Sequence, residues 1–449
     1  MVLDQHAMTT GIHLADEHCR YWTYDGEPTV LVGGSSQDNL FQVPGVEHQL
    51  DRLAAAGGNY VRNTMSARNR REAVLRWGPE HVWPFEQTGT GYDLDRFEPS
   101  YWDRFDRFLE LTAARDIVVQ IEVWATFDYY RDPWDENPFN PANNRTYTAA
   151  ESGLPETVSV SPGGTGPQEQ PFFWSVPDEL DLTLVRDYQE RFVDKLLSHT
   201  LAYDHILYCM DNETNVTPNW GAYWAAYIKE RAAEAGERVY TTEMWLATDL
   251  SDPQHDNTFD HPDRYDFVDI SQNNHNSGQS HYDGAVAQYR RVADSPRPLT
   301  NVKIYGGYVD GFGDEHDAVE RFWRDLFAGA AAVRFHRPPY GIGLNSRAER
   351  MIRSARELAD AVGLDTFEPR PDALTDCEPN EAYAMAAPDG TWLVYFPAGG
   401  SVTVPGDAAS VSCRWYDVEA CRWDADERVE TRVSTPYPKQ WVAVLEPDA

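Results

Sequence analysis

Two glutamates stand at the ends of segments whose composition predicts buried β-strands. HILYCM leads into Asp-Asn212-Glu213, and RVYTTE ends on Glu243. A carboxylate at the end of a buried strand is costly unless it is paired or used. Two such groups can divide the work of a general acid and a general base. We therefore predict Glu213 and Glu243 as catalytic residues, and an ion pair with Arg62 or Lys303 is the other role open to Glu243.

Basic side chains occupy other segments of the same kind. Lys303 lies in LTNVKIY, Arg62 lies in NYVRN, and Arg334 and His336 share one face of AAVRFH. Together with Arg337 they would form a cationic floor that binds a carboxylate or sulfate on a ligand. A structural salt bridge from Lys303 to a nearby glutamate is the alternative, because an unpaired buried ammonium is expensive.

Eight strand-like segments must hold these residues, and amphipathic segments separate them. The strands are expected at 29–33, 59–63, 117–124, 205–210, 238–243, 267–271, 299–305 and 331–336. The clearest helix follows the seventh strand, with one apolar stripe made by Val319, Phe322, Trp323, Leu326 and Phe327. Eight strand–helix pairs predict an α/β fold, a TIM-type (β/α)₈ barrel over residues 1–365. A doubly wound sheet is the alternative, but it would place a Gly-rich loop after the first strand.

The sequence also contains two long connections and, near its C-terminal end, a change to short strands separated by turns. Segments 64–99 and 125–181 each follow a strand, so in a barrel both would lie at the face where active sites form. From about Glu368 short strands alternate with turn signals, as in TWLVYF followed by PAGG. This pattern predicts a small antiparallel β-sandwich over residues 366–449.

The Asn212-Glu213 pair resembles clan A (β/α)₈ glycoside hydrolases, whose acid/base catalyst is the Glu of such a pair after the fourth strand. More narrowly, the chain is similar to apiosidase-like barrels that carry a C-terminal sandwich of the collagen-binding type. In the tail, Asp-Gly before WLVYF, RWYD at 414–417 and a closing Trp-Val carry this likeness. The resemblance covers nearly the whole chain, through short motifs.

The resemblance implies roles for further residues. Glu213 would be the acid/base catalyst, Asn212 would hold a sugar hydroxyl, and Arg62 would lie near the catalytic carboxylates. His275 falls where the clan places a His or Tyr. Pyranose rings present C–H patches to aromatic faces, so four aromatic residues would stack on sugar: Trp124, Trp174, Trp245 and Tyr305.

The seventh strand departs from the family pattern. The clan has its nucleophilic Glu near the end of this strand, and this chain has Asn301-Val302-Lys303 there. An ammonium neither attacks an anomeric carbon nor stabilises an oxocarbenium-like transition state. It would also favour the ionised form of a nearby Glu213, whereas a general acid needs a raised pKa. Other carboxylates are candidates for the second role: Glu243, Glu122, Asp310 and Glu315.

The expected function is hydrolysis of a glycan or oligosaccharide, and an acidic sugar would suit the basic residues. Glu213 would act as general acid, and its distance to the second carboxylate would decide between retention and inversion. A non-catalytic carbohydrate-binding barrel is one alternative, which predicts binding without turnover. A lyase or isomerase of acidic sugars with Lys303 as base is the other, which predicts that Glu213 is dispensable.

The overall composition indicates the solvent conditions and the kinds of partner that suit the protein. Acidic residues number 73 and basic residues 38, which gives a net charge of −35, and very few residues are lysines. Such chains resemble halophilic proteins of salt-loving archaea, because dense carboxylates keep a protein hydrated in concentrated salt. This charge argues against nucleic acid or an anionic membrane as partner. We expect no cofactor and no metal, and a cytoplasmic location, because no signal-like or membrane-spanning segment is evident.

Overall fold

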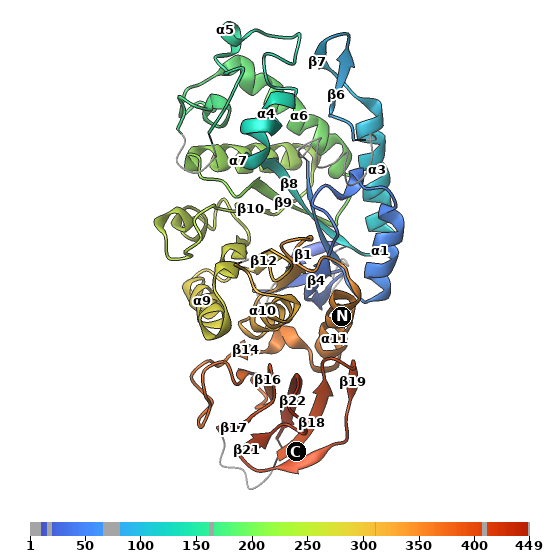
Figure 1. Ribbon diagram of the computed structural model, residues 1–449, viewed down its shortest axis with the longest axis vertical. Helices are drawn as coiled ribbons and strands as arrows, with labels where there is room; N and C mark the ends of the chain where they lie inside the picture. Colours follow the sequence, from blue (N-terminus) through green and yellow to red (C-terminus); the bar gives the residue numbers. More distant parts are fainter. Residues whose placement is uncertain are drawn as a thin grey trace, which may run out of the picture. The chain divides into compact units, whose positions relative to one another are not determined.

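The structure is a computed structural model that describes residues 10–15, 20–65, 81–160, 166–309, 311–405 and 411–447. Eight strands form one sheet in the order β10-β9-β8-β5-β4-β13-β12-β11 (Figure 1). They are β4 (Leu31–Gly34), β5 (Tyr60–Thr64), β8 (Val118–Ala125), β9 (Ile206–Asn212), β10 (Thr241–Thr242), β11 (Val268–Asp269), β12 (Leu299–Ile304) and β13 (Ala332–Phe335). The strands follow one another in chain order, and the last, β13, pairs in parallel with the first, β4. The predicted (β/α)₈ barrel is confirmed.

Between β10 and the segment that leads to β11, a few hydrogen bonds replace a regular strand pairing. The amide of Asp266 donates to the carbonyl of Thr241 (2.8 Å). The hydroxyl of Thr242 donates to the carbonyl of Phe267 (2.7 Å). These bonds satisfy buried polar groups where the two strands are shortest, so the barrel is nearly closed there.

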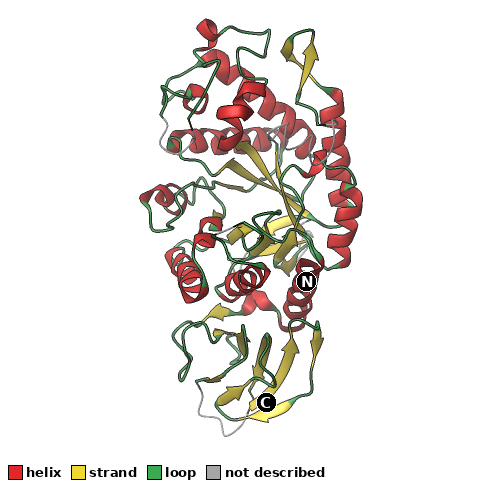
Figure 2. Cartoon of the chain, viewed as in Figure 1, coloured by secondary structure: helices red, strands yellow, loops and turns green. Residues whose placement is uncertain are grey.

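Helices separate the barrel strands (Figure 2). The long ones are α1 (Val46–Ala55), α3 (Pro99–Ala113), α6 (Thr183–Thr200), α7 (Pro218–Ala235), α9 (Gly278–Arg291), α10 (Glu315–Phe327) and α11 (Ser346–Val362). The short ones are α4 (Arg131–Glu136), α5 (Ala149–Ser152) and α8 (Asp256–Phe259). On α10 the whole predicted apolar stripe is buried, and Asp314 caps the helix together with Asp317.

Additional short strands flank the barrel, and the sequence pattern did not predict them. β1 (Ile12–Leu14), β2 (Trp22–Tyr24) and β3 (Glu27–Thr29) form an antiparallel sheet. β6 (Phe85–Thr88) and β7 (Gly91–Phe97) form a hairpin inside the connection expected to be a loop at 64–99. Gly89, with φ of 63°, supplies the left-handed turn of this hairpin.

The C-terminal part is an antiparallel β domain, as expected. Its larger sheet contains β14 (Glu368–Pro369), β15 (Tyr383–Ala386), β16 (Trp392–Phe396), β22 (Trp441–Glu446), β18 (Val411–Asp417), β19 (Arg422–Trp423) and β20 (Glu427–Val429). A second sheet pairs β17 (Ser401–Thr403) with β21 (Arg432–Ser434). Val402 and Val433 of the second sheet share one buried core with Phe396, Trp415 and Trp441 of the first. The two sheets therefore bury their apolar faces against each other.

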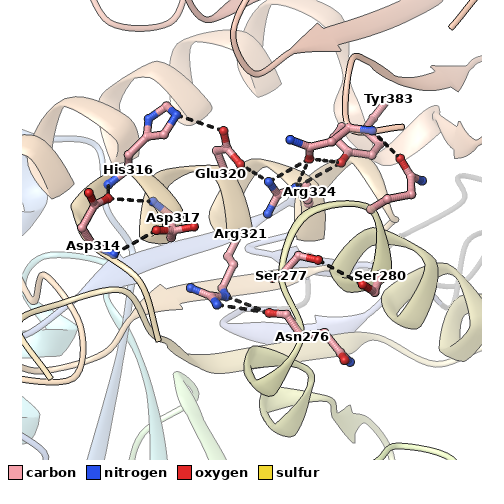
Figure 3. Close-up of polar contacts among 12 residues, drawn as sticks. Asn276, Ser277, Ser280, Asp314, His316, Asp317, Glu320, Arg321, Arg324 and Tyr383 are labelled. Atoms are coloured by element: carbon pink, nitrogen blue, oxygen red, sulfur yellow. Dashed lines mark hydrogen bonds and ion pairs between the residues drawn. The ribbon is translucent and has the colours of Figure 1, made fainter. Parts of the chain in front are cut away.

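Helix α10 contacts this β domain through a buried polar cluster around Arg324 (Figure 3). The guanidinium of Arg324 pairs with Glu320 on the same helix. It also donates to Asn380 Oδ1 (2.9 Å) and to the hydroxyl of Tyr383 (3.1 Å). The ring of Trp323 stacks on Tyr395 of β16. The contact thus combines aromatic packing with a satisfied buried cation.

The chain divides into two compact units, one of residues 1–36, 52–60 and 269–449, the other of residues 37–51 and 61–268. The C-terminal β domain belongs to the first unit, so a boundary at residue 365 stays a prediction. Among the described residues, no helix combines the length and the hydrophobicity that crossing a membrane would need.

Candidate active site

Glu213 lies just beyond the carboxyl end of β9. Its backbone has a φ of 55°, in the left-handed region that non-glycine residues seldom adopt. Its side chain is half-buried, whereas Asn212 and Thr214 on either side are buried. Asn212 Oδ1 is buried and has no hydrogen-bond partner among the described residues. A strained acid beside an unsatisfied amide oxygen is typical of a ligand site rather than of a strand end optimised for stability.

Two further carboxylates lie behind this turn. The carboxylate of Asp211 accepts hydrogen bonds from the amide (2.8 Å) and hydroxyl (2.6 Å) of Thr126. Glu243 Oε1 accepts from the amide of Asp211 (2.8 Å). Burial raises the pKa of both groups, and the nearby charge of Asp211 raises the pKa of Glu243 further.

The other carboxylate oxygen of Glu243 points at helix α7. A Cβ added to Gly221 of α7 would lie only 2.0 Å from Glu243 Oε2 and 2.8 Å from the hydroxyl of Tyr265. Glu243 is 1% exposed, so its carboxylate packs between β10 and α7 instead of facing solvent. The structure therefore gives no support to the catalytic role predicted for Glu243.

Arg62 takes part in a fully buried ion-pair cluster. Its Nε lies 3.0 Å from Glu122 Oε1, and its Nη2 lies 3.3 Å from Asp38 Oδ1. The hydroxyl of Thr64 also donates to Glu122 (2.9 Å). Glu122 on β8 is thus a paired carboxylate whose partner is the guanidinium of Arg62 on β5.

The three tryptophans expected to stack on sugar are buried, and Trp174 among them is 8% exposed. The other two pack closely among protein groups. Trp124 is 0% exposed, and its ring lies 5.3 Å from those of Phe192 and Trp224 (between centroids). Trp245 is 2% exposed, and its indole donates to the hydroxyl of Thr258 (2.8 Å). Rings with this packing belong to a core, and we leave both out of the proposed site.

Lys303 is buried on β12 in a network of amides. Its backbone amide donates to Asn301 Oδ1 (3.1 Å), which also accepts from Asn274 (3.1 Å). Asn301 in turn donates to Asp325 Oδ2 on α10 (2.7 Å). The amide of Tyr305 donates to Asn274 Oδ1 (3.0 Å). This network fixes the backbone at the carboxyl end of β12.

Tyr305 belongs to an aromatic cluster that we define as Tyr305, Phe312, His336, Tyr340 and His275. The ring of Tyr305 lies 4.6 Å from Phe312, 5.0 Å from His336 and 6.0 Å from Tyr340, between centroids. His275 lies 5.3 Å from Phe312. Tyr305 is half-buried, and His275 and Tyr340 are exposed. Partly exposed rings of this kind can pack on the C–H face of a sugar.

The remaining cations and acids have defined surroundings. The guanidinium of Arg334 is buried and donates to the carbonyl of Val302 (2.7 Å) and to the hydroxyl of Ser35. Arg337 lies 5.7 Å from the centroid of the Tyr340 ring. Glu315, at the start of α10, accepts from Tyr308 (2.8 Å) and Asn345 (3.0 Å). The candidate base Asp310 lies outside the described residues.

Sequence reasoning missed four residues in these surroundings: Asp211, Asp325, Phe312 and Tyr340. Asp211 directly precedes the Asn-Glu pair, so alternation along the strand was an available signal. Asp325 lies outside the apolar stripe of α10, so the pattern of the helix gave no signal that this acid is buried. Among the described residues, no group of three or more His, Cys, Asp or Glu side chains is placed to hold a metal ion.

Solved structures resemble this chain, although no protein-family model and no curated protein sequence matches it. A glycoside hydrolase family 5 protein from Bacteroides vulgatus has a TM-score of 0.63 at 12% identity, over 98% of this chain and 93% of that one. A family 5 mannosidase from Rhizomucor miehei has a TM-score of 0.55 at 11% identity, over 79% and 98%. An α-amylase from Geobacillus thermoleovorans has a TM-score of 0.59 at 11% identity, over 94% and 99%.

The fold is that of the (β/α)₈ glycoside hydrolases. At these identities the likeness extends to the arrangement of strands and helices. The chemistry must be argued from the side chains of this chain, because one barrel fold carries many reactions.

Proposed function

We propose that the protein is a glycosidase in which Glu213 is the general acid/base. The observation that carries this proposal is the half-buried Glu213 on a strained turn at the carboxyl end of β9, next to the unsatisfied amide oxygen of Asn212. Carboxyl ends of barrel strands are where active sites of this fold form. A carboxyl group there can protonate the oxygen of a leaving sugar, and Asn212 can bind a ring hydroxyl.

The aromatic cluster supports a carbohydrate as the ligand. The rings of Tyr305, Phe312 and Tyr340 lie together after β12 and β13. His275 and His336 contact these rings and can supply polar groups. Sugar sites combine apolar faces with a few oriented polar groups. Arg337 beside Tyr340 and Lys303 on β12 would suit a carboxylate or sulfate, so an acidic glycan is the proposed substrate class.

Among the candidate carboxylates that the structure describes, we assign the acid/base role to Glu213. Glu122 is held in its ion pair with Arg62, Glu243 packs against α7, and Glu315 receives hydrogen bonds from Tyr308 and Asn345. That β9 and β12 open into one pocket, with a second carboxylate in it, stays a prediction.

The test is release of reducing sugar from a panel of neutral and acidic oligosaccharides. We expect Glu213→Gln to lower kcat by about 10²–10⁴-fold, the usual contribution of a general acid, with unchanged melting temperature. Lys303→Met serves as the comparison, because a lyase or isomerase that uses Lys303 as base would lose turnover there and keep it in Glu213→Gln. Saturable binding without turnover in the wild type would instead identify a binding protein.

The acidic surface leads us to propose that the enzyme works in concentrated salt. A net charge of −35 on 449 residues is self-repulsive in dilute buffer. Assays should therefore include 2–3 M KCl in parallel with low salt, at about the concentrations where repulsion is screened within a few ångströms.

A further inference from the structure

The carboxylate of Asp211 accepts several hydrogen bonds around the turn that contains Glu213. Asp211 accepts from the amide (2.8 Å) and hydroxyl (2.6 Å) of Thr126, which follows the end of β8. It also receives a hydrogen bond from the side chain of Thr214, the residue after Glu213. The carboxylate of Asp211 therefore links the end of β8 to the far side of the Glu213 turn.

Glu243 holds the same turn from the side of β10. Its Oε1 accepts from the backbone amides of Asp211 (2.8 Å) and Met244 (3.3 Å). The backbone adds to this link, because the amide of Thr214 donates to the carbonyl of Met244 (2.9 Å). Side-chain and backbone bonds thus connect the segment 211–214 to β10.

This arrangement is expensive for a purely structural strand end. Asp211 and Glu243 are both buried, and they are adjacent acids. Desolvation raises the pKa of both, and the nearby charge of Asp211 raises the pKa of Glu243 further. Glu213 between them adopts a strained φ of 55°. Costs of this kind accumulate where a functional side chain has to be held in place.

We infer that Asp211 and Glu243 are positioning residues for Glu213, clamping its left-handed turn from β8 and from β10. The inference rests on the proposed catalytic role of Glu213 and deepens it. Removing an acceptor from the clamp would let the turn relax, and the carboxyl group of Glu213 would move away from the leaving-group oxygen. Misplacement of a catalytic group by about 1 Å can cost 10²-fold in rate without loss of substrate binding.

The variants separate acceptor loss from charge loss. Glu243→Gln keeps an acceptor oxygen and resembles the protonated acid, whereas Glu243→Met keeps the volume and loses the acceptor. Thr126→Val removes the hydroxyl that binds Asp211 from the β8 side. Thr200→Val is the matched control, since Thr200 is a buried threonine whose hydroxyl accepts from Tyr208, away from the turn.

Two readouts are measured on each folded variant, the split between kcat and KM and the amide hydrogen exchange of the segment 210–216. We expect Glu243→Met and Thr126→Val to lower kcat about tenfold or more with KM nearly constant, and to exchange about tenfold faster in that segment. Glu243→Gln should restore both quantities to near the wild-type values. Thr200→Val should match Thr126→Val in lost stability and leave both readouts unchanged.

The outcomes distinguish this inference from the proposed function. If wild type cleaves glycosides and both Glu243→Met and Thr126→Val keep its kcat and exchange rates, the clamp is refuted and Glu213 can still be the catalyst. If wild type cleaves no glycoside, the proposed function fails, and unchanged exchange in the two variants refutes the clamp independently. Should Glu243→Met not fold, Thr126→Val against Thr200→Val decides the question.

Discussion

A single glycine decides where the carboxylate of Glu243 lies. Gly221 sits inside helix α7, where alanine would ordinarily be preferred by about 0.5–1 kcal/mol. Here an added Cβ would lie 2.0 Å from Glu243 Oε2. The close approach of the helix to β10 therefore depends on the missing side chain.

We expect Gly221→Ala to destabilise the protein by about 1–3 kcal/mol, the usual cost of overpacking, instead of stabilising the helix. Urea denaturation of Gly221→Ala, Glu243→Ala and the double variant measures the coupling between the two positions. The cost of the alanine should largely disappear when Glu243 is shortened. Equal costs in both backgrounds would show that α7 does not press on this carboxylate.

A second buried acid makes stability depend on pH. Burial raises the pKa of Asp325 from 3.8 to about 7 in the folded protein. The unfolded chain ionises near pH 4 while the folded chain stays protonated, so the stability from this group is complete below pH 4 and is lost as the pH rises through 7. The loss amounts to about 4 kcal/mol for a shift of this size.

Asp325→Asn removes this titration and keeps an acceptor for Asn301, whose amide donates to Asp325 Oδ2. Relative to wild type, the variant should gain about 4 kcal/mol between pH 4 and pH 7.5 in urea denaturation. A difference between the two proteins that is the same at both pH values would contradict the buried, protonated state of Asp325.

At the residue scale the sequence predicted positions better than orientations. The position of Glu213 just after β9 could be predicted, because composition and the Asn-Glu pair mark the end of that strand. Glu243 follows a strand of two residues, which is too short for alternation to predict where its side chain points. The missing side chain of Gly221 leaves room for its carboxylate against α7. Trp124 packs against Phe192 of α6 and Trp224 of α7, and also against Phe172 from the long connection 125–181, which has no periodicity. Contacts of that kind cannot be derived from local pattern.

At the element scale, hydrophobic periodicity was enough to place the barrel strands and the long helices. All eight expected strand segments overlap the observed strands, and α10 lies where its apolar stripe predicted. The strands β1, β2 and β3 were missed because segments of three residues carry too little pattern. The hairpin β6–β7 was missed although Tyr92 to Asp95 alternate between apolar and charged residues, which was an available strand signal.

The polar cluster around Arg324, between α10 and the C-terminal β domain, gives a prediction about stability. Arg324→Met would leave the buried carboxylate of Glu320 without its guanidinium, at a cost of about 3 kcal/mol or more. Tyr383→Phe removes one hydrogen bond to Arg324 and should cost about 1 kcal/mol. Chemical denaturation measures both. Equal and small effects would show that aromatic packing, such as Trp323 on Tyr395, carries the contact without the ion pair.

For the whole molecule, charge dominates the response to solvent. With a net charge of −35, repulsion among carboxylates opposes the compact state and is screened within about 3 Å at 1 M salt. We expect the melting temperature to rise by about 10 °C or more between 0.1 M and 2 M KCl, equivalent to several kcal/mol. Differential scanning calorimetry in a KCl series checks this. A melting temperature that is flat or falls with KCl would contradict adaptation to salt.

In the proposed mechanism, Glu213 donates a proton to the departing sugar oxygen. Proton donation matters most for poor leaving groups, so its loss should depend on the acidity of the group that departs. The most direct measurement is kcat/KM of wild type and Glu213→Gln on a dinitrophenyl glycoside and on the matching oligosaccharide. We expect a loss of about 10²-fold or more on the oligosaccharide and a loss below about tenfold on the dinitrophenyl glycoside. The same loss on both substrates, or no loss on either, would contradict this mechanism.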